Sequence, residues 1–359
     1  MEKLTTESSD HHRLNEDDED DFHCQELVWR PILAFVDSMV LKCAVKLRLF
    51  DAIHRHAGDL PISLPELAAS LPLSPDRLSV LRRLLRYLAH LRLLNLHHGD
   101  SCTLTTASSV YLREASEKSQ AAYVKFLLEE DMFAELHLLD TCLSGGEDVA
   151  GRGGRGDIFE RAAGDSAVNK RFNDGMVCTV RPIIEAVLEG WPEVFEGVSV
   201  LVDVGGGVGV AAAAVGRAFP SMRCIVFDLP HVVEEAPKSD GVEYEAGDLF
   251  VSVPRGDALL LVRIFRDYND EKALQILSRC REAIAEENGK LIIIDGVMNE
   301  TDSKGLRHVK LAFDILMMAF LDGKQRTEKE WRSLLLKAAF TRCNIIRVNA
   351  LMHLIEARP

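Results

Sequence analysis

The stretch of sequence that decides the fold is Val200-Leu-Val-Asp-Val-Gly-Gly-Gly-Val-Gly209. A run of strand-forming residues leads directly into a glycine loop, and an alanine-rich helical segment follows. Gly205 and Gly207 let the backbone turn tightly and let a ligand approach the main chain. This order indicates a nucleotide-type binding site, but the signal alone is weak, since Gly207-x-Gly209-x-x-Ala212 also satisfies the dinucleotide fingerprint.

Outward from this loop, strand-like and helix-like segments alternate. The alternation predicts an α/β fold with a mostly parallel sheet. The last residues form two apolar runs around Asn349, which predict a closing antiparallel hairpin. Strands are expected at residues 198–204, 224–227, 258–262 and 291–294, and helices at residues 211–218 and 271–285.

Three acidic residues follow or end successive predicted strands. Asp203 suits a cationic ammonium group, which S-adenosylmethionine (SAM) carries. Asp228 is placed to hold two ribose hydroxyls. Asp248 can accept from an adenine amino group, with Leu249 and Phe250 stacked on the ring. Any one of these acids alone is more simply a turn former, whereas the three together predict a SAM pocket at the carboxyl edge of the sheet.

The first part of the chain carries helical patterns. Residues 28–50 predict a very apolar helix that is buried in the core or in a subunit interface. Ser63 and Ser74 each precede a helical run, and a hairpin is expected over residues 94–104. Helix, turn, helix and hairpin outline a winged helix. Its arginines could contact DNA, but a hairpin tip without lysine or arginine favours a solvated face or a dimer contact.

Length and charge narrow the class of protein. The 359 residues suggest about two domains. The net charge is −14, and the acid-rich residues 1–22 are predicted to be a disordered tail. An acidic chain argues against nucleic acid as the main partner.

Other signals are mostly negative. Eight scattered cysteines without zinc-ligand spacing predict reduced thiols in a cytoplasmic protein without a metal site. No apolar stretch is long enough for a membrane span, and the acidic start is unlike a signal peptide. The glycine- and arginine-rich residues 148–156 predict a flexible loop.

Several ordered motifs then resemble the plant class of small-molecule O-methyltransferases, of the caffeic-acid, alkaloid and flavonoid type. The resemblance covers nearly everything after about residue 25. It is carried by Leu201-Val-Asp-Val-Gly-Gly-Gly, Phe227-Asp-Leu-Pro-His, Gly247-Asp-Leu-Phe, Arg266-Asp-Tyr-Asn-Asp-Glu, Gly289-Lys-Leu-Ile-Ile-Ile-Asp and Gly323-Lys-Gln-Arg-Thr-Glu.

The resemblance implies a homodimer that moves a methyl group from SAM to a phenolic hydroxyl of a small aromatic substrate. It implies a winged-helix-like dimerisation and substrate-lining domain at residues 23–180. A Rossmann-like SAM-binding domain with a seven-stranded sheet follows at residues 181–359. SAM would be contacted by Gly205, Gly207, Asp228, Asp248, Leu249 and Val262, the last standing where the family has a lysine near the adenine. The acceptor would be lined by Met132, Phe172, Met176 and Met317, which without the resemblance would be ordinary core residues.

The sequence departs from the family at the catalytic centre. Arg266 stands at the position of the base histidine, and arginine cannot accept a proton at any useful pH. Asp295 and Gln325 replace the two glutamates that orient the histidine. Arg266, with Asp267 and Asp295 as ion-pair partners, can instead bind a carboxylate or a phenolate. Glu135 replaces an aromatic residue, and the segment between residues 164 and 169 is short.

Three hypotheses follow. The first is a methyltransferase that works by proximity on an acidic phenol, a carboxylate or an amine. The second is a catalytically impaired homologue that acts as a binding protein or as the partner of an active relative in a heterodimer. The third is a repurposed enzyme that does not transfer a methyl group. A nicotinamide dehydrogenase is disfavoured, because no Tyr-x-x-x-Lys signature is found.

Overall fold

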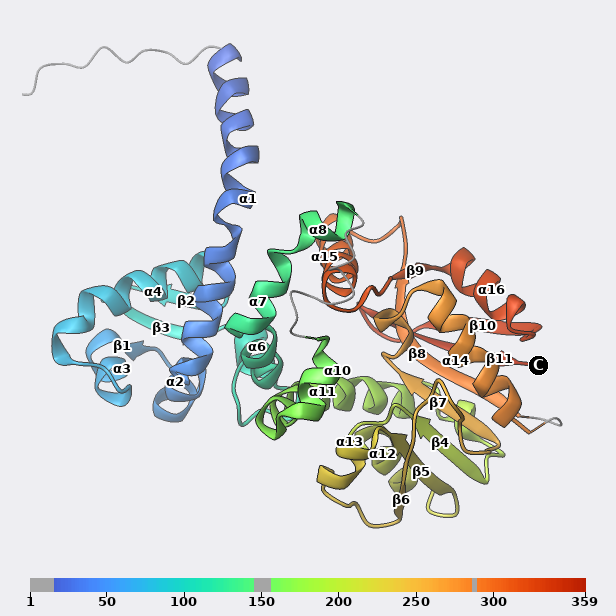
Figure 1. Ribbon diagram of the computed structural model, residues 1–359. Helices are drawn as coiled ribbons and strands as arrows, with labels where there is room; N and C mark the ends of the chain where they lie inside the picture. Colours follow the sequence, from blue (N-terminus) through green and yellow to red (C-terminus); the bar gives the residue numbers. More distant parts are fainter. Residues whose placement is uncertain (1–15, 145–155, 286–288) are drawn as a thin grey trace, which may run out of the picture. The chain divides into compact units, whose positions relative to one another are not determined.

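The computed structural model describes residues 16–144, 156–285 and 289–359 (Figure 1). The chain divides into two compact units, Met1–Thr105 and Thr106–Pro359. The expected boundary between a dimerisation and substrate-lining domain (residues 23–180) and a SAM-binding domain (residues 181–359) is a functional one, and it stays a prediction. The predicted loop at residues 148–156 lies almost wholly outside the described residues.

The first unit opens with two helices where the apolar pattern predicted one. Helix α1 spans Glu16–Lys46, and α2 spans Leu49–Ala57. Arg48 separates them with a φ of 53°, a left-handed conformation that ends one helix and reorients the next. Residues 16–22, expected in the disordered tail, are instead helical. Acidic residues at a helix N-terminus interact favourably with the helix dipole, which offsets their mutual repulsion.

The expected helix, turn, helix and hairpin follow in order. Strand β1 (Ile62–Ser63) leads into α3 (Leu64–Ser70), where Ser63 and Glu66 form the predicted capping box. Ser74 makes no side-chain capping bond, and a short turn, η1 (Pro75–Arg77), comes before α4 (Leu78–His90). Strands β2 (Leu94–His97) and β3 (Ser101–Leu104) form the hairpin, which β1 extends to an antiparallel sheet in the order β1-β3-β2.

The outer part of α1 is apolar and exposed in the single chain. Its large apolar side chains do not enter the core of the first unit, unlike Val45, Leu49 and Phe50 around the helix break. The predicted burial in the core is therefore not found for its outer part, and burial in a subunit interface stays a prediction. Between 49% and 59% of the side chain is exposed at Phe22, Leu27, Val28, Trp29, Ile32, Leu33 and Phe35.

The second unit begins with helices that precede the sheet. Two of them begin at aspartate caps, since Asp157 accepts from the backbone of Phe159 and Glu160, and Asp165 accepts from Ala167 and Val168. The elements are α5 (Thr106–Tyr111), α6 (Ala121–Leu127), α7 (Glu130–Leu136), α8 (Leu139–Ser144), α10 (Ile158–Gly164), α11 (Ser166–Gly190) and η3 (Pro192–Phe195).

The sheet of the second unit has the predicted seven-stranded path, in the order β10-β11-β8-β7-β4-β5-β6. Neighbours from β8 to β6 pair in parallel, and β11 and β10 pair antiparallel as the predicted closing hairpin. The short β9, which was not predicted, adds to β8. The elements are β4 (Val200–Val204), α12 (Val210–Ala218), β5 (Arg223–Asp228), α13 (Pro230–Glu235), β6 (Val242–Ala246), β7 (Ala258–Val262), η4 (Phe265–Asp267), α14 (Asp270–Ala283), β8 (Lys290–Met298), α15 (Lys304–Leu321), β9 (Arg326–Thr327), α16 (Glu328–Lys337), β10 (Arg342–Arg347) and β11 (Met352–Arg358).

Both faces of the sheet are covered by helices, so its strands are apolar on both sides. Val202 and Val204 pack with α14 and α16 around Trp331. Leu201 on the other face packs with α11 and α12. Because the strands from β8 to β6 run parallel, their carboxyl ends lie at one edge of the sheet, where polar residues gather.

We expect the buried Arg326 to be the main polar side chain that stabilises this edge of the sheet. Its guanidinium donates to the carbonyl oxygens of Phe265 and Tyr268 at 2.7 and 2.9 Å and to Asp270 Oδ1 at 2.9 Å. Arg326→Met removes these donors and leaves buried acceptors unsatisfied, which should lower the free energy of unfolding by about 3 kcal/mol.

Urea denaturation followed by circular dichroism measures this loss. The control is Arg223→Met, which removes an exposed ion pair with Glu243 and should leave the unfolding midpoint unchanged. Equal losses of unfolding free energy in the two variants would show that Arg326 does not stabilise this edge more than an exposed ion pair does.

Candidate active site

The glycine loop between β4 and α12 lies against the end of β5. Gly205, with a φ of 68°, donates its backbone N–H to the carbonyl oxygen of Phe227 at 2.8 Å. Gly207 has a φ of 58° and donates to Asp228 Oδ2 at 2.7 Å. At Gly206, an added Cβ would lie 2.7 Å from Asp203 Cγ, closer than real Cβ atoms come. The loop therefore needs glycine both for conformation and for space.

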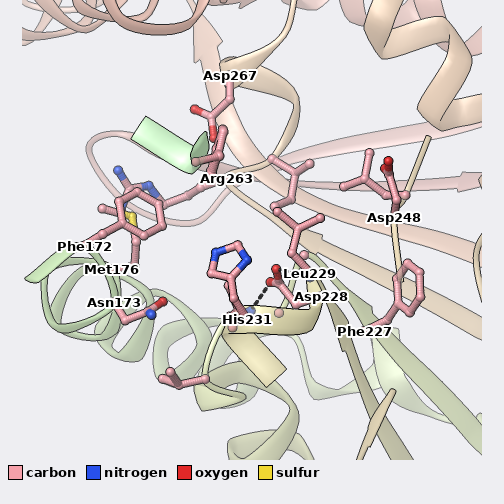
Figure 2. Close-up of a pocket in the computed structure, with 18 of the residues that line it drawn as sticks. Phe172, Asn173, Met176, Phe227, Asp228, Leu229, His231, Asp248, Arg263 and Asp267 are labelled. Carbon is pink, nitrogen blue, oxygen red and sulfur yellow. Dashed lines mark hydrogen bonds between the residues drawn. The ribbon is translucent and has the colours of Figure 1, made fainter. Parts of the chain in front are cut away.

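This loop forms one wall of a cavity of about 480 Å³ in the second unit. All six residues that were predicted to contact SAM line it. Figure 2 shows Asp228, Leu229 and His231 on one side of the cavity, and Phe172, Asn173 and Met176 of α11 on another. The predicted residues that line it are Gly205, Gly207, Asp228, Asp248, Leu249 and Val262.

Asp228 and Asp248 are held by backbone donors. Asp228 accepts from Gly207 and from the N–H of Leu229, each at 2.7 Å. Burial raises the pKa of Asp228, and these two backbone hydrogen bonds act in the opposite direction. Asp248 Oδ1 accepts from the N–H of Phe250 at 2.8 Å. Both carboxyl groups are thus held in fixed orientations at the cavity edge.

The third predicted acid does not reach the cavity. Asp203 is 1% exposed, lies beneath the loop and accepts from the N–H of Ala212 at 3.1 Å. Burial raises its pKa to about 7. The expectation that Asp203 meets a cationic ligand group is therefore wrong. Its role is to tie the glycine loop to the first turn of α12.

The four predicted acceptor-lining residues divide into two pairs. Phe172 and Met176 of α11 line the cavity. Met132 and Met317 do not, and are buried in an apolar cluster that Phe172 and Met176 also contact. The cluster is held by edge-to-face packing of Phe172 on Phe126, with ring centroids 5.5 Å apart. A flat apolar ligand therefore meets one wall made by α11.

The three predicted catalytic residues lie together behind the cavity lining. Arg266 is 4% exposed, and its Nε lies 3.3 Å from Asp295 Oδ1. Gln325, with its amide oxygen turned toward the guanidinium, accepts from Nε at 3.1 Å and from Nη2 at 2.6 Å. The guanidinium also lies over the ring of Phe313, 5.0 Å from its centroid. Burial lowers the pKa of Arg266, and Asp295 acts in the opposite direction.

Glu135, expected where the family has an aromatic residue, is buried in the helical part of the second unit. Its Oε1 lies 3.5 Å from Nη2 of Arg161, whose Nη1 lies 3.3 Å from Asp131. This ion pair borders Met132, which accepts from Arg161 at 3.6 Å through its sulfur. Glu135 thus forms a buried charge pair with Arg161 beside the apolar cluster.

Sequence reasoning missed several charged residues that line the cavity, namely Asp157, Glu160, Arg263, Asp267 and Lys272. Arg263 follows β7 with a φ of 62° and donates from Nη1 to Thr179 Oγ1. Asp267, at the end of η4, was considered only as a partner of Arg266, yet it lines the cavity. The motif Arg266-Asp-Tyr carried Asp267, but nothing in the sequence showed which of its side chains faces the ligand.

Comparisons with known proteins agree with this site. The sequence profile of the O-methyltransferase domain matches residues 136–341, and that of the O-methyltransferase dimerisation domain matches residues 29–114. The chain is 34% identical to (RS)-norcoclaurine 6-O-methyltransferase of Coptis japonica, over 95% of this chain and 98% of that protein. It is 38% identical to trans-resveratrol di-O-methyltransferase of Vitis vinifera, over 94% of this chain and 96% of that protein.

The fold also has solved counterparts. Human N-acetylserotonin methyltransferase, solved in complex with SAM, is similar with a TM-score of 0.78 and 21% identity, over 97% of this chain and 99% of that chain. The chain therefore belongs to the O-methyltransferase family. Family membership confirms the predicted Rossmann-like fold and the predicted cofactor, S-adenosyl-L-methionine. Within the described ranges, no helix has both the length and the apolar character to cross a membrane.

Gly206 provides a direct test of the cofactor site. Gly206→Ala forces the loop away from Asp203, and we expect the affinity for S-adenosylhomocysteine to fall at least tenfold, about 1.4 kcal/mol. Isothermal titration calorimetry measures the affinity. The matched control is Gly305→Ala in the first turn of α15, where nothing lies within 4 Å of the added Cβ. Wild-type affinity in Gly206→Ala would exclude the loop as the cofactor cradle.

Proposed function

We propose that the protein transfers the methyl group of SAM to a phenolic hydroxyl of a small aromatic plant metabolite. The observation that carries the proposal is the single cavity in which the glycine loop, Asp228 and Asp248 share walls with Phe172 and Met176. The relatives' names point the same way, since they name O-methyltransferases of norcoclaurine and of resveratrol.

The residues of the chain divide the work of binding. When bound, SAM supplies an electrophilic methyl group. Asp228 would hold the ribose hydroxyls, and Asp248 the adenine amino group beside Leu249 and Val262. Phe172 and Met176 would hold the aromatic ring of the acceptor and exclude water from it. Orientation of the acceptor oxygen toward the methyl carbon can supply several kcal/mol of the barrier, about 7 or more in well-aligned cases.

The proton of the acceptor hydroxyl is the remaining difficulty. A phenol has a pKa of about 10, so its oxygen must lose the proton to become a good nucleophile. Arg266 cannot take it, because the guanidinium stays protonated, with Nε and Nη2 facing Asp295 and Gln325. The proposed reaction therefore proceeds without a histidine at this position.

The position of Arg266 also favours a second candidate function. A buried Arg266–Asp295 pair in place of a base is also what an impaired homologue would contain, acting as a binding protein or as the partner of an active relative. This candidate keeps the cofactor site and the dimerisation domain but forms no methylated product. The third hypothesis, a repurposed enzyme, would form product without S-adenosylhomocysteine.

The deciding experiment combines binding with turnover. Purified protein is titrated with SAM and S-adenosylhomocysteine, then incubated with SAM and a panel of norcoclaurine, resveratrol, simple catechols, aromatic acids and amines. We expect micromolar binding and release of S-adenosylhomocysteine with at least one phenol. Binding without turnover on every acceptor would favour the impaired homologue. If neither SAM nor S-adenosylhomocysteine binds, both the methyltransferase and the impaired homologue that keeps the SAM site are excluded.

We also propose that the protein is a homodimer through the exposed apolar part of α1. The dimerisation profile begins at residue 29, within this segment. Trp29 and Leu33 are neighbours one helical turn apart, and each is about half exposed. A helix with such apolar exposure needs a covering surface, and a second copy of the chain supplies one of equal character.

The predicted cytoplasmic location stays a prediction.

A charge placed on this face should separate the subunits. The double variant Trp29→Glu and Leu33→Glu should shift the mass in light scattering after gel filtration from twice 39.9 kDa to 39.9 kDa. Glu26→Gln, which alters an exposed residue of the same helix, should stay dimeric. A dimer that survives the double charge would place the interface elsewhere.

A further inference from the structure

One carboxyl group that lines the cavity is neither assigned to SAM nor engaged by a hydrogen-bond donor of the described residues. Five carboxylates line it, namely Asp157, Glu160, Asp228, Asp248 and Asp267. The first four are engaged by backbone N–H groups at helix starts or strand ends. Among the described residues, nothing donates a hydrogen bond to the carboxylate of Asp267. Its oxygens are therefore available to a ligand in the cavity.

Asp267 lies on the acceptor side of the cavity. It ends η4, whose backbone is held by Arg326 through the carbonyl of Phe265 and by Lys324, which donates its N–H to the carbonyl of Arg266 at 2.9 Å. Figure 2 shows Asp267 and Arg263 on the wall away from Asp228 and His231. Asp267 is thus positioned by its backbone rather than by bonds to its side chain.

The charged groups that face Asp267 come from three elements. Arg266 precedes it in η4, Arg263 follows β7, and Asp295 belongs to β8. Burial is the largest influence and raises the pKa of Asp267 to about 7, against the pull of the two arginines. A carboxyl group with a pKa near neutrality can both accept a proton from an acceptor and return it to water.

We propose that Asp267 is the general base of the methyl transfer. This rests on the proposed function above. The carboxylate takes the proton of the acceptor hydroxyl as the oxygen forms its bond to the methyl carbon. The bond between that carbon and the sulfur of SAM breaks, and its electron pair stays on sulfur to give neutral S-adenosylhomocysteine. The proton then passes from Asp267 to water.

Arg263 complements this role. Its Nη1 donates to the neutral groups Thr179 Oγ1 and Met176 Sδ, and its buried Nε has no hydrogen-bond partner among the described residues. No ion pair of its guanidinium within 4 Å is present in the described part of the chain. A cation in this position lowers the pKa of a neighbouring phenol. The difference in pKa between the phenol and Asp267 becomes smaller, so the proton transfer costs less free energy.

Other titratable groups fit the role less well. His231 lines the cavity beside Asp228, on the side assigned to the cofactor. Burial raises the pKa of the Tyr268 hydroxyl far above its ordinary value, so it remains protonated. Arg266 is occupied by Asp295 and Gln325. Asp267 is the lining group on the acceptor side that can accept a proton.

One arm of the test needs no acceptor. A carboxyl group whose folded pKa is raised binds more protons in the folded than in the unfolded state between about pH 4 and 7, so its contribution to stability falls as the pH rises through this window. Unfolding free energies of the wild type and Asp267→Asn are compared from pH 4 to 8. We expect the wild type to lose stability relative to the variant across the window. A constant difference would overturn the proposal.

The second arm measures turnover on the phenol with which the panel gives most S-adenosylhomocysteine. Asp267→Asn should lower kcat by about 10²-fold or more and remove the acidic limb of the pH profile. Its affinity for S-adenosylhomocysteine should stay within twofold of the wild type. Asp267→Glu should restore part of the rate. The control Asp174→Asn, which alters a surface carboxylate paired with Lys170, should keep the wild-type rate and profile.

Two results would remove the assignment. One is an Asp267→Asn variant that keeps its rate and its acidic limb. The other is loss of that limb in His231→Gln, which would make His231 the base. A wild type that binds S-adenosylhomocysteine but methylates no phenol refutes the proposed function instead, and the stability arm then decides whether Asp267 titrates as a base must.

Discussion

The site depends on one steric constraint, the close approach of the glycine loop to the ends of β4 and β5. Gly206 passes so near Asp203 that no side chain fits between them, and Gly205 and Gly207 donate to the neighbouring strand end. The approach brings Asp228 to the cavity edge and lets α12 start directly behind the loop. Asp203, hidden beneath it, accepts from α12 and so joins strand, loop and helix.

A second polar centre, separate from the loop, holds the opposite wall. Arg326 donates to the carbonyl of the first residue of η4 and to that of the residue after it, while Arg266 contacts Asp295, Gln325 and Phe313. Between them they hold the short turn from which Asp267 projects. Buried arginines thus set the backbone here, whereas the ligand-facing chemistry comes from residues next to them in sequence.

The sequence predicted the parallel strands and the glycine loop well, and the residues expected to contact SAM line one cavity, because these features depend on local patterns. Alternating apolar residues, glycines without room for Cβ and acids at strand ends leave a direct trace. The break at Arg48 and the added strands β1 and β9 left none, since they depend on packing between distant segments. The sequence also could not show that the Asp203 side chain points away from the cavity. Nor could it show that Arg263 and Asp267, rather than Arg266, line the cavity, because this depends on the three-dimensional path of the chain.

The enclosure of Arg266 has an evolutionary consequence. Exchanging this arginine alone for a smaller neutral residue would leave Asp295, which is fully buried, without its cationic partner, and breaking a buried pair from one side costs about 3–5 kcal/mol. Gln325 would lose its donors in the same step. The three positions are therefore entrenched. Any single substitution among the three passes through a destabilised protein, so change at this site is easier at neighbouring side chains.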